Sequence, residues 1–169
     1  MFDHQENPEL KAARAVAFRF LGHSARSCAE IERRLERAGF ELEVVTSLMA
    51  ELQRDGYLND DKFASDWIQD RADRKRYGKT RLTAELTQRG VDRDTISNVI
   101  GAVSDEDEIR RAMEIVISKS KDCLESQQTQ EDAHKVTHRL AQLLLRRGFN
   151  WDIVKQVLAL QAENRKELS

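Results

Sequence analysis

The chain has 169 residues, of which 40% are hydrophobic and 34% are charged, and its formal net charge is -2. This length suits one ordinary domain or a short array of small units, and the hydrophobic content is sufficient for a buried core. The near-neutral net charge does not indicate a nucleic-acid-binding protein. No segment approaches the run of about 20 apolar residues that would span a bilayer.

The composition also favours helices over strands. The chain holds one proline and seven glycines, whereas strand-rich folds need many turns marked by these residues. Cys28 and Cys123 lie far apart and belong to no CxxC pair, which is typical of a reducing compartment. The opening segment, Met1 to Leu10, lacks the basic start and apolar run of a signal peptide. We therefore expect a cytoplasmic, all-α protein.

Three glycines, Gly39, Gly90 and Gly148, mark internal repeats at spacings of 51 and 58 residues. Each follows a stripe of apolar residues four and eight positions earlier, which lies on one face of a helix. The stripes contain Ile31 and Leu35, Leu82 and Leu86, and Leu140 and Leu144. The pattern predicts that each glycine ends a helix in the left-handed conformation, and that the next apolar residue folds back on the last turn.

The first predicted repeat begins with a helix over about Pro8–Gly22, where Pro8 fits a first turn. Its second helix ends at Gly39, and its third begins after Glu41, a weak helix cap. Apolar residues recur along this third helix at Val44, Val45, Leu48 and Met49.

The second predicted repeat begins with a helix over about Asp61–Lys75, which carries Phe63, Trp67 and Ile68. Its second helix follows the turn at Tyr77 and Gly78 and ends at Gly90. Its third helix follows Asp92, whose side chain can accept a hydrogen bond from the helix N-terminus.

The third predicted repeat has helices over about Asp105–Glu125 and Thr129–Arg147, with the polar segment Ser126–Asp132 interpreted as a loop. Asn150 is expected to cap the last helix. Trp151, just past this cap, is expected to be partly exposed. The complete pattern predicts three tandem three-helix repeats, over residues 8–57, 58–103 and 104–165, in an elongated, curved array.

No catalytic or cofactor-binding motif occurs in the sequence. It lacks GxxxxGK[ST], GxGxxG, HExxH and GxSxG. His134 and His138 would share a helix face, but no third metal ligand is evident beside them, so a solvated helix face is the favoured interpretation. We expect no catalytic residue, no cofactor, no metal and no enzymatic activity.

The most informative polar feature is a basic band between Arg71 and Arg93, in which eight cations face three acids. It can be interpreted as an electrostatic contact with nucleic acid or an acidic protein surface. It can equally reflect cations at a helix C-terminus and Arg–Glu pairs one helical turn apart. The candidate contact residues are Arg71, Arg74, Lys75, Arg76, Tyr77, Lys79, Arg81 and Arg89.

Four segments together resemble the RecX family, bacterial regulators of the RecA recombinase. They are SCAEIERRLERAGF from Ser27, GYLNDDKFA from Gly56, RKRYGKTRLTAELTQRGV from Arg74 and LLLRRGF from Leu143. The resemblance covers about residues 10–160. It implies three tandem three-helix units and binding to the RecA filament on DNA, where growth, ATP hydrolysis and strand exchange would be impeded. It thereby implies a role in DNA repair, recombination and the SOS response.

Some residues depart from the family pattern. Lys79 stands where the family often has proline, and Asn59 replaces an aspartate; neither change alters the implied role. The resemblance also implies that some members contact DNA directly, both single- and double-stranded.

Two functional hypotheses follow. The first is a non-enzymatic regulator that binds the RecA filament as a monomer, since no heptad seam predicts a coiled-coil dimer and no membrane contact is expected. The second is a stand-alone DNA-binding protein of the helix-turn-helix type. The balanced charges of the first and third repeats favour the first hypothesis.

Overall fold

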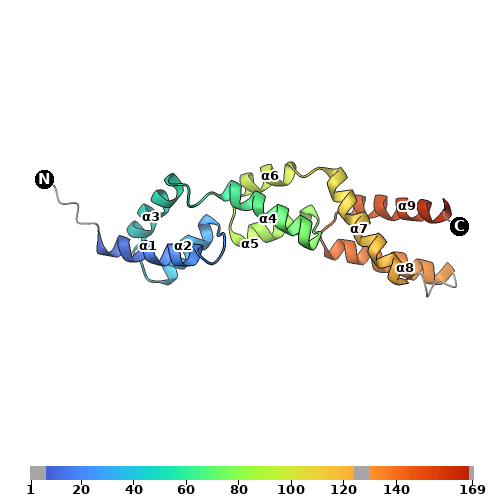
Figure 1. The fold of residues 1–169 in the computed structure, drawn as a ribbon, viewed down its shortest axis with the longest axis horizontal. Helices are drawn as coiled ribbons and strands as arrows, with labels where there is room; N and C mark the ends of the chain where they lie inside the picture. The colour runs from blue at the N-terminus through green and yellow to red at the C-terminus, as the bar shows by residue number, and fades with distance from the viewer. Residues whose placement is uncertain (1–6, 124–129, 168–169) are drawn as a thin grey trace. The chain divides into compact units, whose positions relative to one another are not determined.

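A computed structural model describes residues 7–123 and 130–167, and in this part of the chain it contains helices and no strand. The all-α class predicted from the composition is therefore confirmed (Figure 1). The helices are α1 (Pro8–Leu21), α2 (Cys28–Arg37), α3 (Leu42–Arg54), α4 (Asp60–Lys75), α5 (Lys79–Arg89), α6 (Arg93–Gly101), α7 (Asp105–Cys123), α8 (Gln130–Arg146) and α9 (Trp151–Glu167).

The three repeat glycines adopt the predicted left-handed conformation, with φ angles of 85° at Gly39, 83° at Gly90 and 84° at Gly148. At the first of these turns, the N–H of Phe40 donates to the carbonyl of Leu35 and the N–H of Gly39 to that of Glu36. This pair of bonds is the Schellman motif, which satisfies the last carbonyls of a helix.

The same two bonds recur after α5 and α8. Val91 and Phe149 donate to the carbonyls of Leu86 and Leu144, at 3.2 Å in both cases. The sequence repeat is thus one backbone motif that is used three times.

Helix starts follow the capping chemistry of the sequence. Asp92 accepts a hydrogen bond of 2.9 Å from the N–H of Thr95, and Asn150 accepts one of 2.8 Å from that of Ile153. Glu41 precedes α3 without a side-chain cap, as expected from its longer side chain.

Residues of the chain group into two compact units. Unit 1 contains residues up to Asp66 together with Leu86–Ile96, and unit 2 contains Trp67–Glu85 together with the residues from Ser97 onward. Each of the helices α4, α5 and α6 therefore contributes residues to both units.

The core of unit 1 lies between α1, α2 and α3, which Figure 1 shows beside one another. Small alanines of α1 allow α2 and α3 to approach closely, and the apolar stripes of those helices fill the space. An ion pair of 2.9 Å between Arg14 and Glu51 joins α1 to α3 at the edge of this core. The core residues are Ala13, Ala17, Ile31, Leu35, Val44, Val45, Leu48, Leu52 and Leu58.

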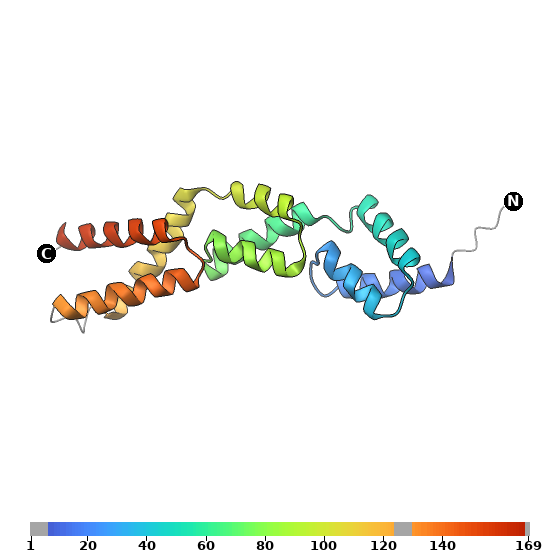
Figure 2. The ribbon, with the colours of Figure 1, turned by 180° about the vertical axis from the view of Figure 1, so that it is seen from behind.

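The core of unit 2 lies between α7, α8 and α9, which Figure 2 shows from behind. It is larger and contains a fully buried aromatic residue, Phe149, from the third Schellman turn. The core residues are Ala112, Ile115, Val116, Val136, Leu140, Ala141, Leu144, Phe149, Ile153, Val154 and Val157.

The polar segment before α8 differs from the prediction. We expected a loop over Ser126–Asp132, but α8 already begins at Gln130, so residues 130–132 are helical. Polar composition alone does not exclude a helix, because glutamine and glutamate are good helix formers. Residues 124–129, including the predicted ends at Glu125 and Thr129, lie outside the described part of the chain.

Candidate partner-contact site

The predicted contact residues lie on the end of α4, the turn after it and α5. Arg74 and Lys75 occupy the last turn of α4, where their positive charge interacts favourably with the helix dipole. Arg76 follows with a φ of 51°, a left-handed conformation that is uncommon outside glycine and that ends the helix. Tyr77 and Gly78 complete the turn into α5.

Arg71 and Arg81 meet at one carboxylate within unit 2. Both guanidinium groups lie 3.4 Å from the carboxylate of Glu85. Each also stacks on an aromatic ring, Arg71 over Trp67 at 4.1 Å and Arg81 over Tyr77 at 4.0 Å. The predicted pairing of Arg81 with Glu85 is confirmed, and Trp67 is half-buried beneath Arg71. These two cations and Glu85 therefore connect α4 to α5 within unit 2.

Lys79 connects the start of α5 to the start of α7. Its ammonium nitrogen lies 2.6 Å from Asp105 and 3.9 Å from Glu108. Glu108 is fully buried, and it accepts a hydrogen bond of 2.9 Å from the backbone N–H of Lys79. The buried carboxylate of Glu108 thus lies near the ammonium group of Lys79 and accepts a hydrogen bond from the first N–H group of α5. That N–H group has no acceptor inside its own helix.

Arg76 is anchored to α7 by Glu114, whose carboxylate lies 2.9 Å from the guanidinium Nε. The hydrogen bond from Arg76 lowers the pKa of the Glu114 carboxyl, and the charge of Arg110 lowers it further. Because both partners remain about half-exposed, this pair contributes little to stability on its own.

Arg89 belongs to unit 1, unlike the other seven predicted contact residues. Its guanidinium lies 2.8 Å from Glu30 of α2. Within unit 2, Arg74 and Lys75 point outward: the side chain of Arg74 is 79% exposed although it pairs with Asp70, and Lys75 is also exposed. Most cations of the basic band within unit 2 are therefore engaged in ion pairs, and the accessible ones are Arg74, Lys75 and the half-exposed Arg76.

Neither a metal site nor a membrane span is found in the described residues. His134 and His138 are exposed on α8, and His138 lies 2.9 Å from the amide of Gln142. No group of three or more metal-ligating side chains occurs in residues 7–123 and 130–167. No described helix is sufficiently long and apolar to cross a membrane. Trp151 is 52% exposed, as the sequence predicted.

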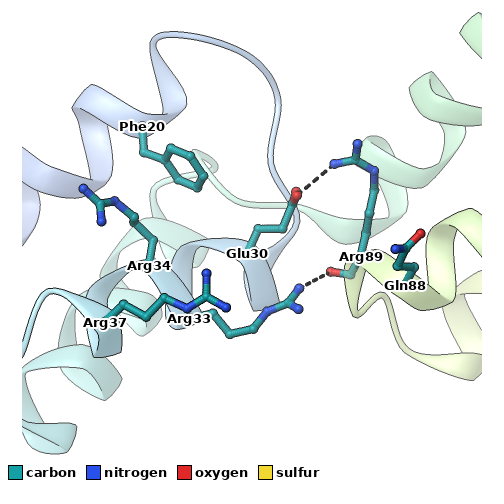
Figure 3. A pocket seen from close by; sticks show the side chains of 7 residues that line it. All are labelled: Phe20, Glu30, Arg33, Arg34, Arg37, Gln88 and Arg89. Carbon is teal, nitrogen blue, oxygen red and sulfur yellow. Dashed lines mark hydrogen bonds and ion pairs between the residues drawn. The ribbon is translucent and has the colours of Figure 1, made fainter.

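Sequence reasoning missed a second basic surface, in unit 1, which we call the arginine groove (Figure 3). It is a hollow of about 380 Å³ between the end of α1, the face of α2 and the end of α5. Four guanidinium groups and one carboxylate line it. The lining residues are Phe20, Glu30, Arg33, Arg34, Arg37, Gln88 and Arg89.

The signal for this groove is visible in the sequence only after α2 is placed. Arg33, Arg34 and Arg37 occupy positions i, i+1 and i+4 and so share one side of the helix. Acids such as Glu32 and Glu36 alternate with these arginines along the sequence, so the charges of the segment balance. The sequence therefore does not reveal that the arginines gather on one side of the helix.

The chain is similar over most of its length to known bacterial proteins. A profile described as "RecX, first three-helix domain" matches residues 13–52, and one described as "RecX, second three-helix domain" matches residues 59–100. "Regulatory protein RecX" of Mycobacterium avium is 34% identical over 158 residues, which cover 91% of this chain and 89% of that protein. The protein of the same description from Mycolicibacterium smegmatis is 32% identical over 156 residues, 92% of this chain and 82% of the relative.

Solved structures show the same fold. The crystal structure of RecX from Lactobacillus salivarius superimposes with a TM-score of 0.80 at 14% identity and covers 89% of this chain and 95% of that one. A second crystal structure, of a regulatory protein RecX, gives a TM-score of 0.71 at 17% identity, with 88% and 71% covered. Together with the sequence relatives, these likenesses confirm the resemblance found in the four sequence segments: the chain belongs to the RecX family of regulatory proteins.

Proposed function

We infer that this protein is a non-enzymatic regulator that binds the RecA filament on DNA and limits its growth, ATP hydrolysis and strand exchange. The observation that carries the proposal is its 34% identity to a regulatory protein RecX over 89% of that relative. Its action is that of a binding protein, working in the cytoplasm as a monomer.

Repeated three-helix units support this mode of action. The repeats proposed over residues 8–57, 58–103 and 104–165 each bring their own surface, so that several modest contacts can act together along a repetitive partner. A filament is itself a repeat of identical subunits, and a ligand with several contact surfaces can engage neighbouring subunits and dissociate slowly.

Within the basic band, we propose Arg74 and Lys75 as the main partner contacts. The side chain of Arg74 is 79% exposed although it pairs with Asp70, and Lys75 is also exposed, whereas the side chains of Arg71 and Lys79 are only 27% and 24% exposed and pair with acids of unit 2. An exposed cation attracts an acidic partner more strongly than one that is largely buried beside a carboxylate. Of the remaining predicted residues, Arg76 and Tyr77 then have contacts within unit 2, and Arg89 pairs with α2 in unit 1.

The experiment that tests the function is DNA-dependent ATP hydrolysis by RecA on single-stranded DNA, with this protein added far below stoichiometric amounts. Progressive loss of hydrolysis is expected, because few molecules can halt the growth of a filament of many subunits. Unchanged hydrolysis at equimolar protein, with helical folding verified by circular dichroism, would contradict the proposal.

The same preparation addresses the alternative of a stand-alone helix-turn-helix DNA-binding protein. That alternative requires tight, sequence-specific binding to duplex DNA without RecA. Weak, salt-sensitive binding that is independent of sequence would instead agree with the proposed function.

A further inference from the structure

The glycine turns that end α5 and α8 are each covered by the start of another helix. At the turn after α5, the hydroxyl of Ser27 at the start of α2 donates to the carbonyl of Arg89 at 2.7 Å. At the turn after α8, the N–H of Gly78 at the start of α5 donates to the carbonyl of Arg147 at 2.9 Å. The first contact lies within unit 1 and the second within unit 2. In both, a group at a helix start donates to the carbonyl just before the turn glycine, and we call this arrangement a helix-start junction.

The covering helix approaches each of these two turns closely. A Cβ on Gly90 would lie 2.5 Å from the Cβ of Ala29 in α2, and a Cβ on Gly148 would clash with the backbone of Arg81 in α5. Glycine is therefore required at both turns for two reasons, which are the left-handed backbone and the lack of room for a side chain.

The turn after α2 has the same backbone but is open. Its two hydrogen bonds are those of the other two turns, and yet a Cβ on Gly39 would meet nothing within 4 Å. Phe40 is only partly buried, whereas Val91 and Phe149 at the corresponding positions are buried. Ala38 is exposed, and among the described residues nothing donates a hydrogen bond to its carbonyl, the counterpart of the acceptors in the two helix-start junctions. This turn is thus built like the other two, without the helix that covers them.

The charges around the open turn favour the positive end of a helix as its occupant. The carbonyl end of α2 carries partial negative charge. Residues 36–43 add one cation, Arg37, and three exposed acids: Glu36, Glu41 and Glu43. The start of a helix carries partial positive charge and N–H groups that have no acceptor within that helix. The open turn and a helix start are therefore complementary in charge and in hydrogen bonding.

Two further features define the expected occupant. Ser27 and Gly78 both have small side chains, so the docking helix should begin with serine, glycine or alanine. Next to the open turn, Leu42 is 71% exposed and lines a hollow of about 740 Å³ together with four polar residues: Glu41, Glu43, Thr46 and Ser47. An apolar side chain of the partner that covers Leu42 would add a hydrophobic contact to the polar contacts of the turn.

We propose that the open turn, residues 38–42, is a docking surface for the N-terminal end of a helix in the protein that this chain regulates. The inference rests on the proposed function for the identity of that protein, and it adds a contact surface in unit 1 to Arg74 and Lys75 of unit 2. The helix starts of this chain at Ser27 and Gly78 are engaged in their own junctions, which favours another protein over a second copy as the occupant.

Gly39→Asn closes the open turn, because its side chain fills the space that the docking helix would occupy, and Gly56→Asn is its matched control. Asparagine adopts the left-handed conformation more readily than most other residues with a side chain, so both turns should persist. Gly56 has a φ of 77° against 85° at Gly39, ends α3 with the same pair of hydrogen bonds and also has nothing within 4 Å of a Cβ. The two glycines lie at opposite ends of α3, whose 13 residues span about 20 Å.

The measurement is ATP hydrolysis by RecA on single-stranded DNA, with each variant titrated and its folding verified by circular dichroism. Gly39→Asn should need at least about tenfold more protein than the unaltered chain for equal inhibition, because an extra side chain in a close-packed contact forces the two surfaces apart. Gly56→Asn should inhibit as the unaltered chain does. Leu42→Ser should also weaken inhibition, by about tenfold, and it tests the same surface if Gly39→Asn fails to fold.

Hydrogen exchange locates the contact. Addition of the RecA–DNA filament should slow amide exchange in residues 36–43 of the unaltered chain and of Gly56→Asn, and should not slow it in Gly39→Asn. A substitution that only altered stability would change exchange in these residues without the filament as well.

The outcomes separate this inference from the proposed function. If the unaltered chain inhibits RecA and Gly39→Asn inhibits as well as Gly56→Asn does, the docking surface is wrong and the proposed function stands. If the unaltered chain does not inhibit RecA, both fail. Sedimentation tests the remaining occupant: self-association of the unaltered chain that Gly39→Asn abolishes would place a second copy on the turn and overturn the proposal.

Discussion

The hydroxyl of Ser27 donates a hydrogen bond of 2.7 Å to the carbonyl of Arg89, and this contact joins the start of α2 to the glycine turn of the next repeat. An equivalent contact occurs in unit 2, where the N–H of Gly78 donates to the carbonyl of Arg147 at 2.9 Å. Ser27 precedes Gly39 by the same number of residues as Gly78 precedes Gly90. One repeat is therefore joined to the next by a backbone carbonyl just before the turn glycine.

Replacing Ser27 by alanine should destabilise unit 1 by about 2 kcal/mol. The hydroxyl is buried; it caps α2 through the N–H of Glu30 and donates to the carbonyl of Arg89. Loss of the cap costs about 1 kcal/mol and loss of the second hydrogen bond a similar amount. Urea unfolding measures the change. Ser47→Ala, at an exposed position of α3, should change the free energy of unfolding by less than about 0.5 kcal/mol. Equal effects of the two substitutions would show that the contact of Ser27 with Arg89 does not stabilise the fold.

Gly39 and Gly90 form a matched pair that tests the close contact between Gly90 and Ala29. Both have a left-handed backbone, so alanine at either costs about 1–2 kcal/mol in backbone strain. A Cβ at Gly39 would meet nothing within 4 Å, whereas one at Gly90 would lie 2.5 Å from the Cβ of Ala29. We expect Gly90→Ala to cost at least about 1 kcal/mol more than Gly39→Ala.

The double variant A29G/G90A isolates that contact. Removing the Cβ of Ala29 relieves the clash. The double variant should therefore lose less free energy of unfolding than the two single variants lose in total. Strict additivity in urea unfolding would show that the two residues do not meet.

Features that depend on local chemistry could be predicted from the sequence, and those that depend on distant partners could not. The glycine turns and the caps at Asp92 and Asn150 require only neighbouring residues, and all were predicted correctly. Glu108 and Glu114 lie far along the chain from Lys79 and Arg76, so no local pattern indicates that these acids neutralise the basic band.

The arginine groove illustrates the same limit. Its residues come from α1, α2 and α5, and the sequence shows Arg34 and Arg37 interleaved with acids. Only in the folded helix α2 do the arginines and the glutamates lie on different sides. The helix predicted over about Thr129–Arg147 agrees with α8, Gln130–Arg146, but the loop predicted over Ser126–Asp132 extends too far, because a polar segment can be either helix or loop until its packing is known.

The buried carboxylate of Glu108 offers a test of the connection between α5 and α7. Glu108→Ala should cost about 3 kcal/mol, because it leaves the N–H of Lys79 without an acceptor and removes a buried partner of its ammonium group. Glu108→Gln keeps an acceptor oxygen and should cost clearly less. Asp105→Asn alters an exposed partner of Lys79 and should change the free energy of unfolding by less than about 1 kcal/mol. An equal loss in all three variants would contradict this ordering.

Acid should weaken the start of α6. The N–H of Thr95 donates to the carboxylate of Asp92 and holds the pKa of that carboxyl below its ordinary value. A lowered folded-state pKa means that this contribution to stability is complete above the unfolded-state pKa and is lost as the pH falls through the folded-state pKa.

Asp92→Asn tests this dependence because the amide oxygen accepts the same hydrogen bond at every pH. The unaltered chain should exceed the variant in stability by more at pH about 6 than at pH about 3, as measured by urea midpoints at both values. A difference that does not change with pH would show that the charge of Asp92 contributes nothing to the cap.

Charge reversal at Arg74 and Lys75 tests the proposed contact with the RecA filament. Both side chains are exposed in the last turn of α4, so R74E/K75E should remain folded although the acids oppose the helix dipole there. Inhibition of DNA-dependent ATP hydrolysis by RecA should require about tenfold more of this variant, because two attractive charges become repulsive. R54E/K62E makes the same net charge change at the end of α3 and the start of α4, away from Arg74 and Lys75, and should inhibit normally. If both variants inhibit equally, the filament is contacted elsewhere, and the basic band serves only to hold unit 2 together.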